Sequence, residues 1–339
     1  MFKAVRLNAI TYPVDPAEQE DLDRCGATVT AIEGQQPDEI LAAAADCDAL
    51  LVVSSHVPGK VIEELKRCRV LARLGAGVDR VDIETATRCG IVVSNVPDFC
   101  LVEQAEHTLA LLLAVGRRLP YMTDAMRRGE WSARHHPGVH RIAGQTLGLV
   151  GFGASARAVA TRARGLGLRL IAWARNPAKY QAEAKSRDVE LVELAPLLRE
   201  SDFVSIHLPL TPDTRHLLDA GRIALMKPTA VLINTARGAI VDEAALVQAL
   251  REKRIAGAGL DVFEGIDAFS LQHTPAKHGL LELDNVILTP HCAGSSVEST
   301  RESKARGVRN AADVLLGHWP RHVVNPEVKP RWPLLIPGE

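Results

Sequence analysis

The chain of 339 residues is long enough for two domains of ordinary size. Its 40 basic and 41 acidic residues give a net charge of −1, which excludes a field of one sign that would attract nucleic acid or an anionic membrane. The hydrophobic fraction of 47% is typical of a globular protein, and the longest apolar stretch, Leu109–Val115, is too short to span a bilayer.

The N-terminus and the cysteines predict a cytoplasmic protein. Residues Met1–Val5 begin directly with a strand-like pattern and lack the layout of a signal peptide. The cysteines show no CxxC spacing and no dense framework, so we expect reduced thiols that are mostly buried. They are Cys25, Cys47, Cys68, Cys89, Cys100 and Cys292.

Strand-like and helix-like segments alternate over the first hundred residues. The expected strands are Ala4–Leu7, Thr28–Ala31, Ala49–Val53, Val70–Leu74 and Ile91–Ser94. The expected helices are Pro16–Cys25, Pro37–Ala45, Pro58–Cys68 and Ile83–Cys89. This alternation predicts a doubly wound parallel sheet, and therefore an α/β domain that precedes the rest of the chain. A long helix follows from Val102 through Leu119, and its almost continuously apolar middle predicts burial between domains or between subunits.

The most informative pattern is a strand–turn–helix at Leu147–Ala156. The apolar run Leu147–Val150 breaks at two glycines and continues as a helix with small and apolar residues at helical spacing. Gly151 permits a tight turn, Gly153 lets backbone N–H groups approach a pyrophosphate, and Ala156 takes the third position, where alanine is an accepted variant. The pattern predicts a dinucleotide site, and an ordinary βα turn is the alternative.

Further strands give this second domain six, the number expected for a dinucleotide-binding sheet. They are Leu168–Trp173, Phe203–Leu208, Val231–Asn234, Gly259–Val262 and Val286–Leu288. A last helix, Val297–Leu316, is predicted to return to the first domain and to make that domain discontinuous.

Three motifs follow predicted strands, where open α/β sheets bind ligands. Arg237, in Asn-Thr-Ala-Arg-Gly, can hold a carboxylate through two parallel hydrogen bonds and polarise a neighbouring carbonyl. His291, in Thr-Pro-His-Cys-Ala-Gly, has the pKa range to donate a proton to a carbonyl oxygen or to remove one from a hydroxyl. Gly75–Asp79 is a glycine-rich turn that can bind an anion. Each motif alone also fits a structural role, but together they supply the groups needed for hydride transfer to a 2-keto acid.

In these blocks, from Leu71 through Pro326, the chain resembles the D-isomer-specific 2-hydroxyacid dehydrogenase family. Within the family, the chain is similar to the C-terminal binding protein-like and phosphoglycerate dehydrogenase-like subgroup. The segment Asn95–Cys100 carries the similarity to the C-terminal binding proteins. The matching blocks are Gly75–Asp79, Ala105–Thr108, the Gly151 turn, His207–Thr211, Met226–Gly238, Gly259–Phe263 and Thr289–His291.

The resemblance implies two doubly wound parallel-sheet domains. A Rossmann NAD(P) domain, residues 102–292, would be inserted into a flavodoxin-like substrate domain, residues 1–101 and 293–339. The active site would lie in a cleft between them that closes by a hinge, and the protein would usually be a homodimer. The family needs no metal.

The resemblance also implies roles for individual residues. Arg237 would bind the substrate carboxylate and carbonyl, His291 would be the acid–base residue, and backbone groups of Ala76 and Gly77 would help to hold the carboxylate. The positions expected against the cofactor are Thr108, Gly151, Gly153, Ala154, Ser155, Ala156, Ala174, Arg175, His207, Thr235, Ala236, Arg237, Asp261, His291 and Gly294.

The sequence departs from the family beside the expected acid–base residue. Members normally carry a glutamate five residues after the equivalent of Asp261, where it hydrogen-bonds the catalytic histidine. Ile266 takes that place here and cannot orient an imidazole. Three alternatives remain: Asp267 takes over as a catalytic residue, Glu264 turns inward, or His291 works without a carboxylate. We slightly favour Asp267, because the neighbouring glycine makes the loop pliable.

A second departure concerns the cofactor. The second strand of a Rossmann sheet normally ends in an acid that binds the ribose 2′-hydroxyl of NAD, and Ala174 stands there in this chain. Arg175 follows, and its guanidinium suits a 2′-phosphate. We therefore predict a preference for NADP(H) over NAD(H), with a solvated arginine at a strand end as the alternative.

Two further groups are predicted to lack a chemical role. His135, His136 and His140 fit a solvated loop better than a metal site. Cys292 is expected to point away from His291 and to pack as a small apolar residue.

The leading hypothesis is an NAD(P)-dependent oxidoreductase that interconverts a 2-keto acid and its D-2-hydroxy acid. A dinucleotide-sensing binding protein with little turnover is an alternative from another class. A dehydrogenase for a sugar or polyol acid is a third, since Ile266 and the insertion Phe269–Lys277 would reshape the site. The sequence does not identify the substrate.

Overall fold

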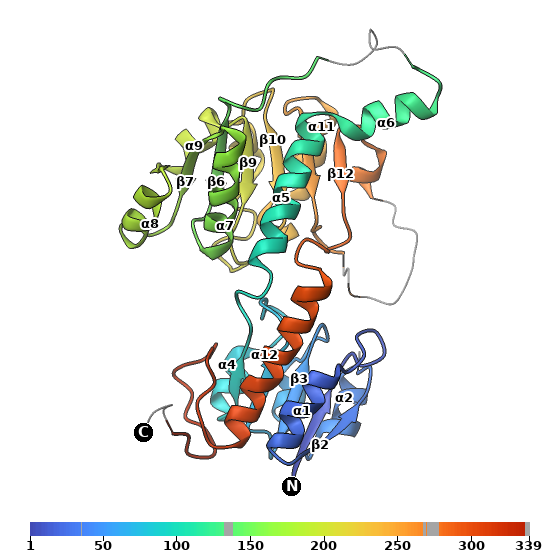
Figure 1. The fold of residues 1–339 in the computed structure, drawn as a ribbon, viewed down its shortest axis with the longest axis vertical. Coiled ribbons are helices and arrows are strands. Elements are labelled where there is room, and N and C mark those ends of the chain that lie inside the picture. Colours follow the sequence, from blue (N-terminus) through green and yellow to red (C-terminus); the bar gives the residue numbers. More distant parts are fainter. Residues whose placement is uncertain (35, 132–137, 267–268, 270–277, 336–339) are drawn as a thin grey trace. The chain divides into compact units, whose positions relative to one another are not determined.

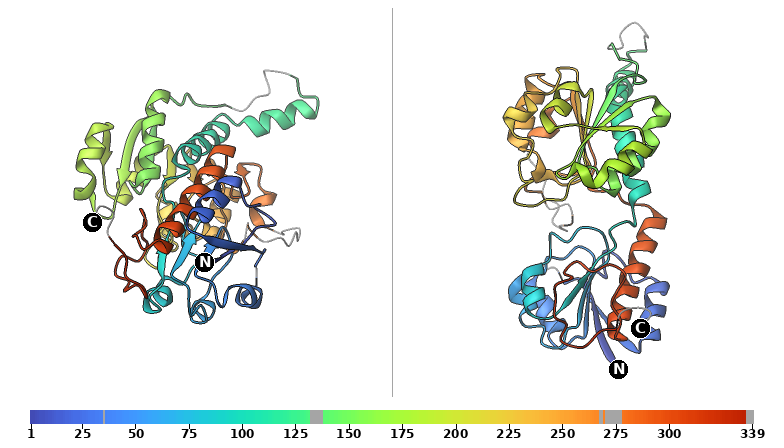
Figure 2. Two further views of the ribbon diagram at one scale, coloured as in Figure 1. Left: turned by 60° about the horizontal axis from the view of Figure 1, so that its bottom comes forward. Right: turned by 90° about the vertical axis from the view of Figure 1, so that its left-hand side faces the viewer.

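The computed structural model describes residues 1–339 except 35, 132–137, 267–268, 270–277 and 336–339. The chain forms two compact units: unit 1 holds residues 1–100 and 296–339, and unit 2 holds residues 101–295 (Figure 1). Each is a parallel sheet with helices on both faces (Figure 2). The fold class predicted from the sequence is thereby confirmed.

Unit 1 is built on a sheet whose described strands have the order β2-β1-β3-β4-β5, a flavodoxin-like arrangement. The strands are β1 (Phe2–Arg6), β2 (Ala27–Ala31), β3 (Ala49–Val52), β4 (Val70–Arg73) and β5 (Val92–Ser94). The helices are α1 (Pro16–Arg24), α2 (Pro37–Ala44), α3 (Gly59–Ile62), α4 (Ile83–Arg88) and α12 (Val297–Leu315).

The central strands of unit 1 are apolar on both faces because helices cover both. One core layer lies between the sheet and helices α1 and α12, and the other between the sheet and α2, α3 and α4. Helix α3 is shorter than the predicted Pro58–Cys68. Its chain leaves the helix after Ile62 and buries Leu65 and Cys68 through tight turns, with the Cys68 N–H bonded to the Leu65 carbonyl at 3.3 Å.

Unit 2 has, within its described residues, seven strands in the order β12-β11-β10-β9-β6-β7-β8, which is a Rossmann order with one strand added. They are β6 (Thr146–Val150), β7 (Arg169–Trp173), β8 (Val189–Leu191), β9 (Phe203–Ile206), β10 (Val231–Asn234), β11 (Gly257–Leu260) and β12 (Val286–Leu288). The helices are α5 (Leu101–Gly116), α6 (Leu119–Arg127), α7 (Ala154–Ala163), α8 (Gln181–Ser186), α9 (Leu194–Glu200), α10 (Ala220–Ile223) and α11 (Glu243–Arg251).

The predicted number of six strands is wrong because β8 was missed. Strand β8 is three residues long, pairs only with β7 among the described strands, and carries an exposed glutamate at its centre. An edge strand with one buried residue leaves too little apolar pattern to be recognised.

The predicted long helix through Leu119 is also corrected. Helix α5 ends at Gly116, and α6 begins at Leu119 after Arg118 takes a left-handed conformation with φ 51°. Helix α5 packs against α7 and strands β10, β11 and β12 of its own unit, so its buried stripe belongs to the core of unit 2. The apolar middle of α5 therefore reflects packing within unit 2.

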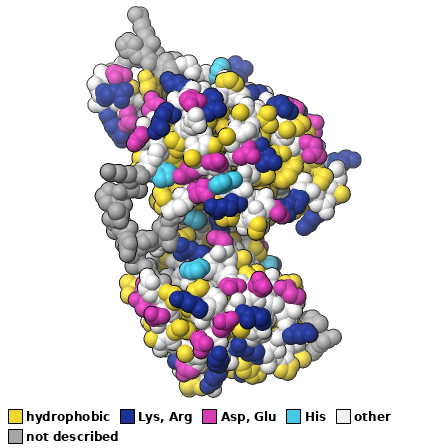
Figure 3. Space-filling view, turned by 180° about the vertical axis from the view of Figure 1, so that it is seen from behind, with side chains coloured by type: hydrophobic (Ala, Val, Ile, Leu, Met, Phe, Trp, Pro, Cys, Tyr) yellow, Lys and Arg dark blue, Asp and Glu magenta, His cyan; other side chains and the backbone are white. Residues whose placement is uncertain are grey.

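The surface of each unit mixes positive and negative side chains on the face drawn in Figure 3. Among the described residues, no helix is both long and apolar enough to cross a membrane.

Candidate active site

The carboxyl ends of the parallel strands of unit 2 share one edge of the sheet, and the predicted site residues of this unit follow those ends. They are Gly151–Ala156 after β6, Ala174 and Arg175 after β7, His207 after β9, Thr235–Arg237 after β10, Asp261 after β11, and His291 and Gly294 after β12. Thr108 lies on α5, where its hydroxyl oxygen is 2.9 Å from that of Thr235.

The glycine turn fits the pyrophosphate of a dinucleotide. Gly151 has φ 101°, and a Cβ added there would lie 2.5 Å from the carbonyl oxygen of His207, so only glycine is tolerated. A Cβ added to Gly153 would meet nothing within 4 Å, which leaves room in front of α7. The first amide of α7 to bond inside the helix is that of Arg157, so the preceding amides are available to an anion.

His207 is buried beside this turn. Its Nδ1 lies 2.9 Å from the hydroxyl oxygen of Ser155 and its Nε2 lies 2.8 Å from that of Ser205. Burial lowers the pKa of His207 to about 3, so the imidazole is neutral at physiological pH. No sequence pattern pointed to Ser205, because its place on β9 becomes relevant only once β9 lies next to β6.

At the end of β7, Ala174 is buried and Arg175 is exposed. The Arg175 Nη1 lies 3.2 Å from an Oδ2 of Asp213, and both side chains are largely in solvent. Asp213 was not among the predicted residues, since its link to Arg175 depends on the path of the loop after β9.

The turn that carries Arg237 is fixed by Asn234, the last residue of β10. The amide of Asn234 donates to the Arg237 carbonyl at 2.9 Å and accepts from the Ala236 N–H at 3.0 Å. Gln104 of α5 donates to the Thr235 carbonyl at 2.9 Å. The backbone of the turn is therefore held from both sides, while the Arg237 Nη1 donates to the Ala236 carbonyl at 2.7 Å.

The carboxylate of Asp261 organises the turn that follows β12. It is fully buried and accepts three hydrogen bonds: from the Thr289 hydroxyl at 2.6 Å, the Cys292 N–H at 2.9 Å and the Ala293 N–H at 2.8 Å. Between these donors, His291 adopts a left-handed conformation with φ 55°, and its N–H donates to the Asp261 carbonyl at 2.9 Å. A non-glycine residue in this region is uncommon and often marks a functional position.

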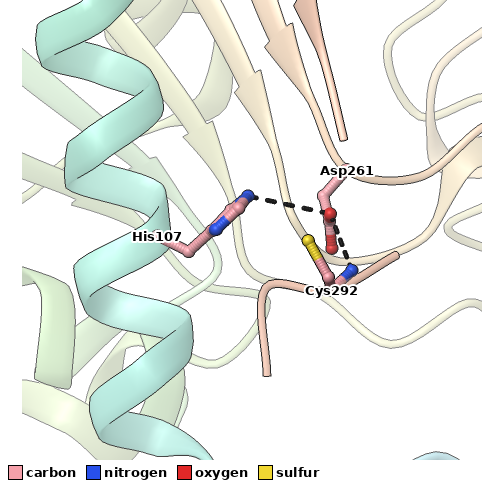
Figure 4. Close-up of side chains that lie close together, drawn as sticks. All are labelled: His107, Asp261 and Cys292. Carbon is pink, nitrogen blue, oxygen red and sulfur yellow. Dashed lines mark hydrogen bonds and ion pairs between the residues drawn. The ribbon is translucent and has the colours of Figure 1, made fainter. Parts of the chain in front are cut away.

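His107 and Cys292 complete the surroundings of Asp261 (Figure 4). The His107 Nε2 lies 2.9 Å from the Thr289 hydroxyl and 3.7 Å from an oxygen of Asp261. The potential ligand atoms of His107, Asp261 and Cys292 lie within 4.8 Å of one another, a spacing that a metal ion could use. Both Asp261 oxygens already accept hydrogen bonds, so a structural role explains the carboxylate. His107 was missed as a site residue, although it stands in one of the matching blocks.

Cys292 differs from its prediction. Its side chain is half-buried and faces Asp261 and not an apolar core, because the turn presents it to the buried carboxylate (Figure 4). Burial, together with the charge of Asp261, raises the pKa of the Cys292 thiol. The residue therefore stays protonated and is not an activated nucleophile.

In unit 1, the turn after β4 carries Ala76 and Gly77. Asn95 donates to the Ala76 carbonyl at 2.7 Å, and the Val96 N–H donates to the Gly75 carbonyl at 3.0 Å. These bonds fix the carbonyl side of the turn and leave Ala76 and Gly77 only half-buried.

Comparison with known proteins identifies the family. Residues 109–293 match the family model described as D-isomer specific 2-hydroxyacid dehydrogenase, NAD binding domain. The chain belongs to this family. It is therefore an oxidoreductase that uses a nicotinamide dinucleotide.

Individual relatives extend the match over most of the chain. D-3-phosphoglycerate dehydrogenase of Methanocaldococcus jannaschii is 37% identical over 93% of this chain, which spans 59% of that protein's length. Glyoxylate reductase of Thermococcus gammatolerans is 42% identical over 84% of each chain. The structure of acyclic imino acid reductase Bsp5, in complex with NADPH and D-Arg, has a TM-score of 0.84 at 28% identity, covering 95% of this chain and 99% of that one.

The loop where this dehydrogenase departs from its family is partly described. Ile266, at the place of the family glutamate, is 40% exposed. Glu264 accepts hydrogen bonds from His216 and Arg215, each at 2.8 Å, so its carboxylate is directed to these two side chains. Asp267 lies outside the described residues, as do two of the three loop histidines, His135 and His136.

Phe269 is an addition to the predicted site of the dehydrogenase. Its ring lies against the imidazole of His291, with ring centroids 4.9 Å apart and an interplanar angle of 50°. The sequence pointed to this stretch only as an insertion, and nothing in it predicted an aromatic contact with His291.

Because His207 is buried and neutral, we expect the dehydrogenase to lose stability at acidic pH. The unfolded chain takes up a proton near pH 6.5, whereas the folded state resists protonation until about pH 3. The contribution of His207 to the free energy of unfolding is therefore complete above pH 6.5. It falls as the pH drops, and about 2–3 kcal/mol is lost at pH 4.5. Urea unfolding at pH 7 and 4.5 measures the difference. His207→Gln, which cannot charge, should show a smaller difference, and equal differences would contradict this account.

Proposed function

We propose that this protein reduces a small 2-keto acid of the glyoxylate type to the D-2-hydroxy acid with NADPH, and catalyses the reverse reaction. The observation that carries the proposal is that Arg237 and His291 stand on two turns at one edge of the unit 2 sheet, which Asn234 and Asp261 hold by hydrogen bonds. The likeness to a glyoxylate reductase over 84% of each chain supports the substrate class.

Arg237 and His291 act on different groups of the substrate in this proposal. When bound, the dinucleotide supplies or accepts the hydride. The Arg237 guanidinium binds the carboxylate and polarises the keto group. His291 donates a proton to the carbonyl oxygen during reduction and removes it from the hydroxyl during oxidation. In unit 1, the backbone amides of Ala76 and Gly77 are our candidate for a further carboxylate contact. Asp267 is our candidate partner for His291.

Other residues hold the dinucleotide in this proposal. The amides of Ala154, Ser155 and Ala156 face the pyrophosphate at the open N-terminus of α7. The remaining contacts are Thr108, Gly151, Gly153, Ala174, Arg175, His207, Thr235, Ala236, Asp261 and Gly294.

A screen of 2-keto acids with NADPH tests the proposed reaction. We expect turnover with small keto acids, and a loss on the order of 10²–10³-fold in kcat/KM for Arg237→Ala, because the keto oxygen loses its charged partner. Arg251→Ala, which removes an exposed arginine of α11, is the matched control and should leave kcat/KM unchanged. If no keto acid exceeds the Arg237→Ala background, the dinucleotide-sensing alternative is favoured. Turnover confined to sugar or polyol acids would favour the third.

We also propose that NADP(H) is preferred over NAD(H). Ala174 provides no carboxylate to repel a 2′-phosphate. The bond between Arg175 and Asp213 is an exposed ion pair, of a kind that contributes about 0–1 kcal/mol, so a phosphate can replace Asp213. The Bsp5 structure, determined with NADPH, supports the same choice.

The ratio of kcat/KM with NADPH to that with NADH measures this preference. Arg175→Ala should lower the ratio about tenfold, because a charge-assisted hydrogen bond to the phosphate is lost. Arg199→Ala, at an exposed arginine of α9, should leave it unchanged. A constant ratio in Arg175→Ala would refute the role of this residue.

We further propose that the protein works as a homodimer in the cytoplasm. Helix α6 has no buried residue of its own and exposes Leu119, Tyr121 and Met126, and Trp131, which follows the helix in the sequence, is exposed as well. An apolar surface of this kind is suited to cover by a second copy. No disulfide joins the six cysteines, all of which the structure describes, and this suits a reducing compartment.

A further inference from the structure

Three side chains form a continuous hydrogen-bonded chain from the centre of β9 to the first turn of α7. The hydroxyl of Ser205 is 2.8 Å from the Nε2 of His207, and the Nδ1 of His207 is 2.9 Å from the hydroxyl of Ser155. Ser205 is fully buried, His207 is 8% exposed and Ser155 is half-buried. This series of hydrogen bonds therefore begins in the core and ends at the place proposed for the pyrophosphate.

The position of His207 relative to the glycine turn is fixed by the backbone. The His207 N–H donates to the Val150 carbonyl at 2.8 Å, directly before the turn. The His207 carbonyl lies so close to Gly151 that a Cβ there would be 2.5 Å from its oxygen. The backbone of His207 is consequently held beside the turn that leads into α7, which carries Ser155.

Burial decides which ring nitrogen of His207 carries the proton. A neutral imidazole has one N–H and one acceptor nitrogen. Within the part of the chain that the structure describes, the Ser205 hydroxyl is bonded to the Nε2 of His207. If Ser205 did not donate to this nitrogen, its hydroxyl proton would be left unpaired in the core. Nε2 is therefore the acceptor, and Nδ1 carries the proton and donates it to Ser155.

This assignment also sets the direction of the Ser155 hydroxyl. Its oxygen accepts from His207, so its own proton points away from the ring. A hydroxyl that accepts a hydrogen bond is polarised and becomes a better donor. A pyrophosphate oxygen carries negative charge and offers only acceptors, which complements this donor.

We propose that the Ser205–His207–Ser155 chain fixes the Ser155 hydroxyl as a dedicated hydrogen-bond donor to the pyrophosphate of the bound dinucleotide. The inference rests on the proposed dinucleotide site but not on the keto acid chemistry. The Ser155 hydroxyl contacts the pyrophosphate, and for this contact His207 and Ser205 are positioning residues.

The tautomer of His207 is read by two-bond ¹H–¹⁵N NMR of the protein without ligand. We expect a protonated Nδ1 and an unprotonated Nε2, with the signal identified by its absence from His207→Gln. Ser205→Ala should weaken this preference, because the donor to Nε2 is lost. A protonated Nε2 in the unaltered protein would overturn the proposal.

Binding of NADPH and NADH, followed by calorimetry without substrate, tests the functional part. Ser155→Ala should weaken both dinucleotides about tenfold, and Ser155→Thr, which keeps the hydroxyl, should restore most of the affinity. As a single substitution, Ser205→Ala should weaken binding about threefold. Added to Ser155→Ala, it should have no further effect, because the effects of substitutions within one hydrogen-bond network are not additive. Ser186→Ala, an exposed serine of α8, is the matched control.

The two possible failures are distinguishable. Affinities within twofold across the Ser155 and Ser205 variants would overturn this inference and leave the proposed reaction in place. Failure of the unaltered protein to bind either dinucleotide would overturn the proposed function and this inference together.

Discussion

The candidate active site depends on one buried carboxylate. Asp261 accepts hydrogen bonds from three donors of the turn after β12, and two of them are backbone amides, of which that of Ala293 belongs to a buried residue. An unsatisfied buried donor costs about 1–3 kcal/mol, so the turn has one favourable conformation. Through the Thr289 hydroxyl the same carboxylate is linked to His107 on α5. One residue therefore fixes the end of β12 to the end of β11 and to a helix.

The left-handed conformation of His291 follows from this constraint. Such a conformation is strained for a residue with a side chain, and it persists only where the surroundings determine it. Here the amides on its C-terminal side bond to the Asp261 carboxylate, and its own N–H bonds to the Asp261 carbonyl. The backbone thus sets the direction of the Cα–Cβ bond of His291, and none of these hydrogen bonds involves position 266.

The sequence predicted the fold class and the edge of the sheet where the site lies, because both follow from short-range patterns. Alternating strands and helices specify a parallel sheet, and residues directly after its strands meet at one edge. The pairings of Arg175 with Asp213 and of Ser155 with His207 could not be predicted, since the partners are 38 and 52 residues apart and meet only in the folded sheet. The edge strand β8 escaped because a three-residue strand leaves almost no pattern.

Hydrogen exchange at the amides of Cys292 and Ala293 tests the central role of Asp261 most directly. In Asp261→Asn an NH₂ group faces donors that the carboxylate accepted, so we expect these two amides to exchange about tenfold to a hundredfold faster. The amides of Gly257–Leu260 in β11, which bond within the sheet, should keep their protection. Unchanged exchange at Cys292 and Ala293 would contradict the account, because the turn would then be held by something other than Asp261.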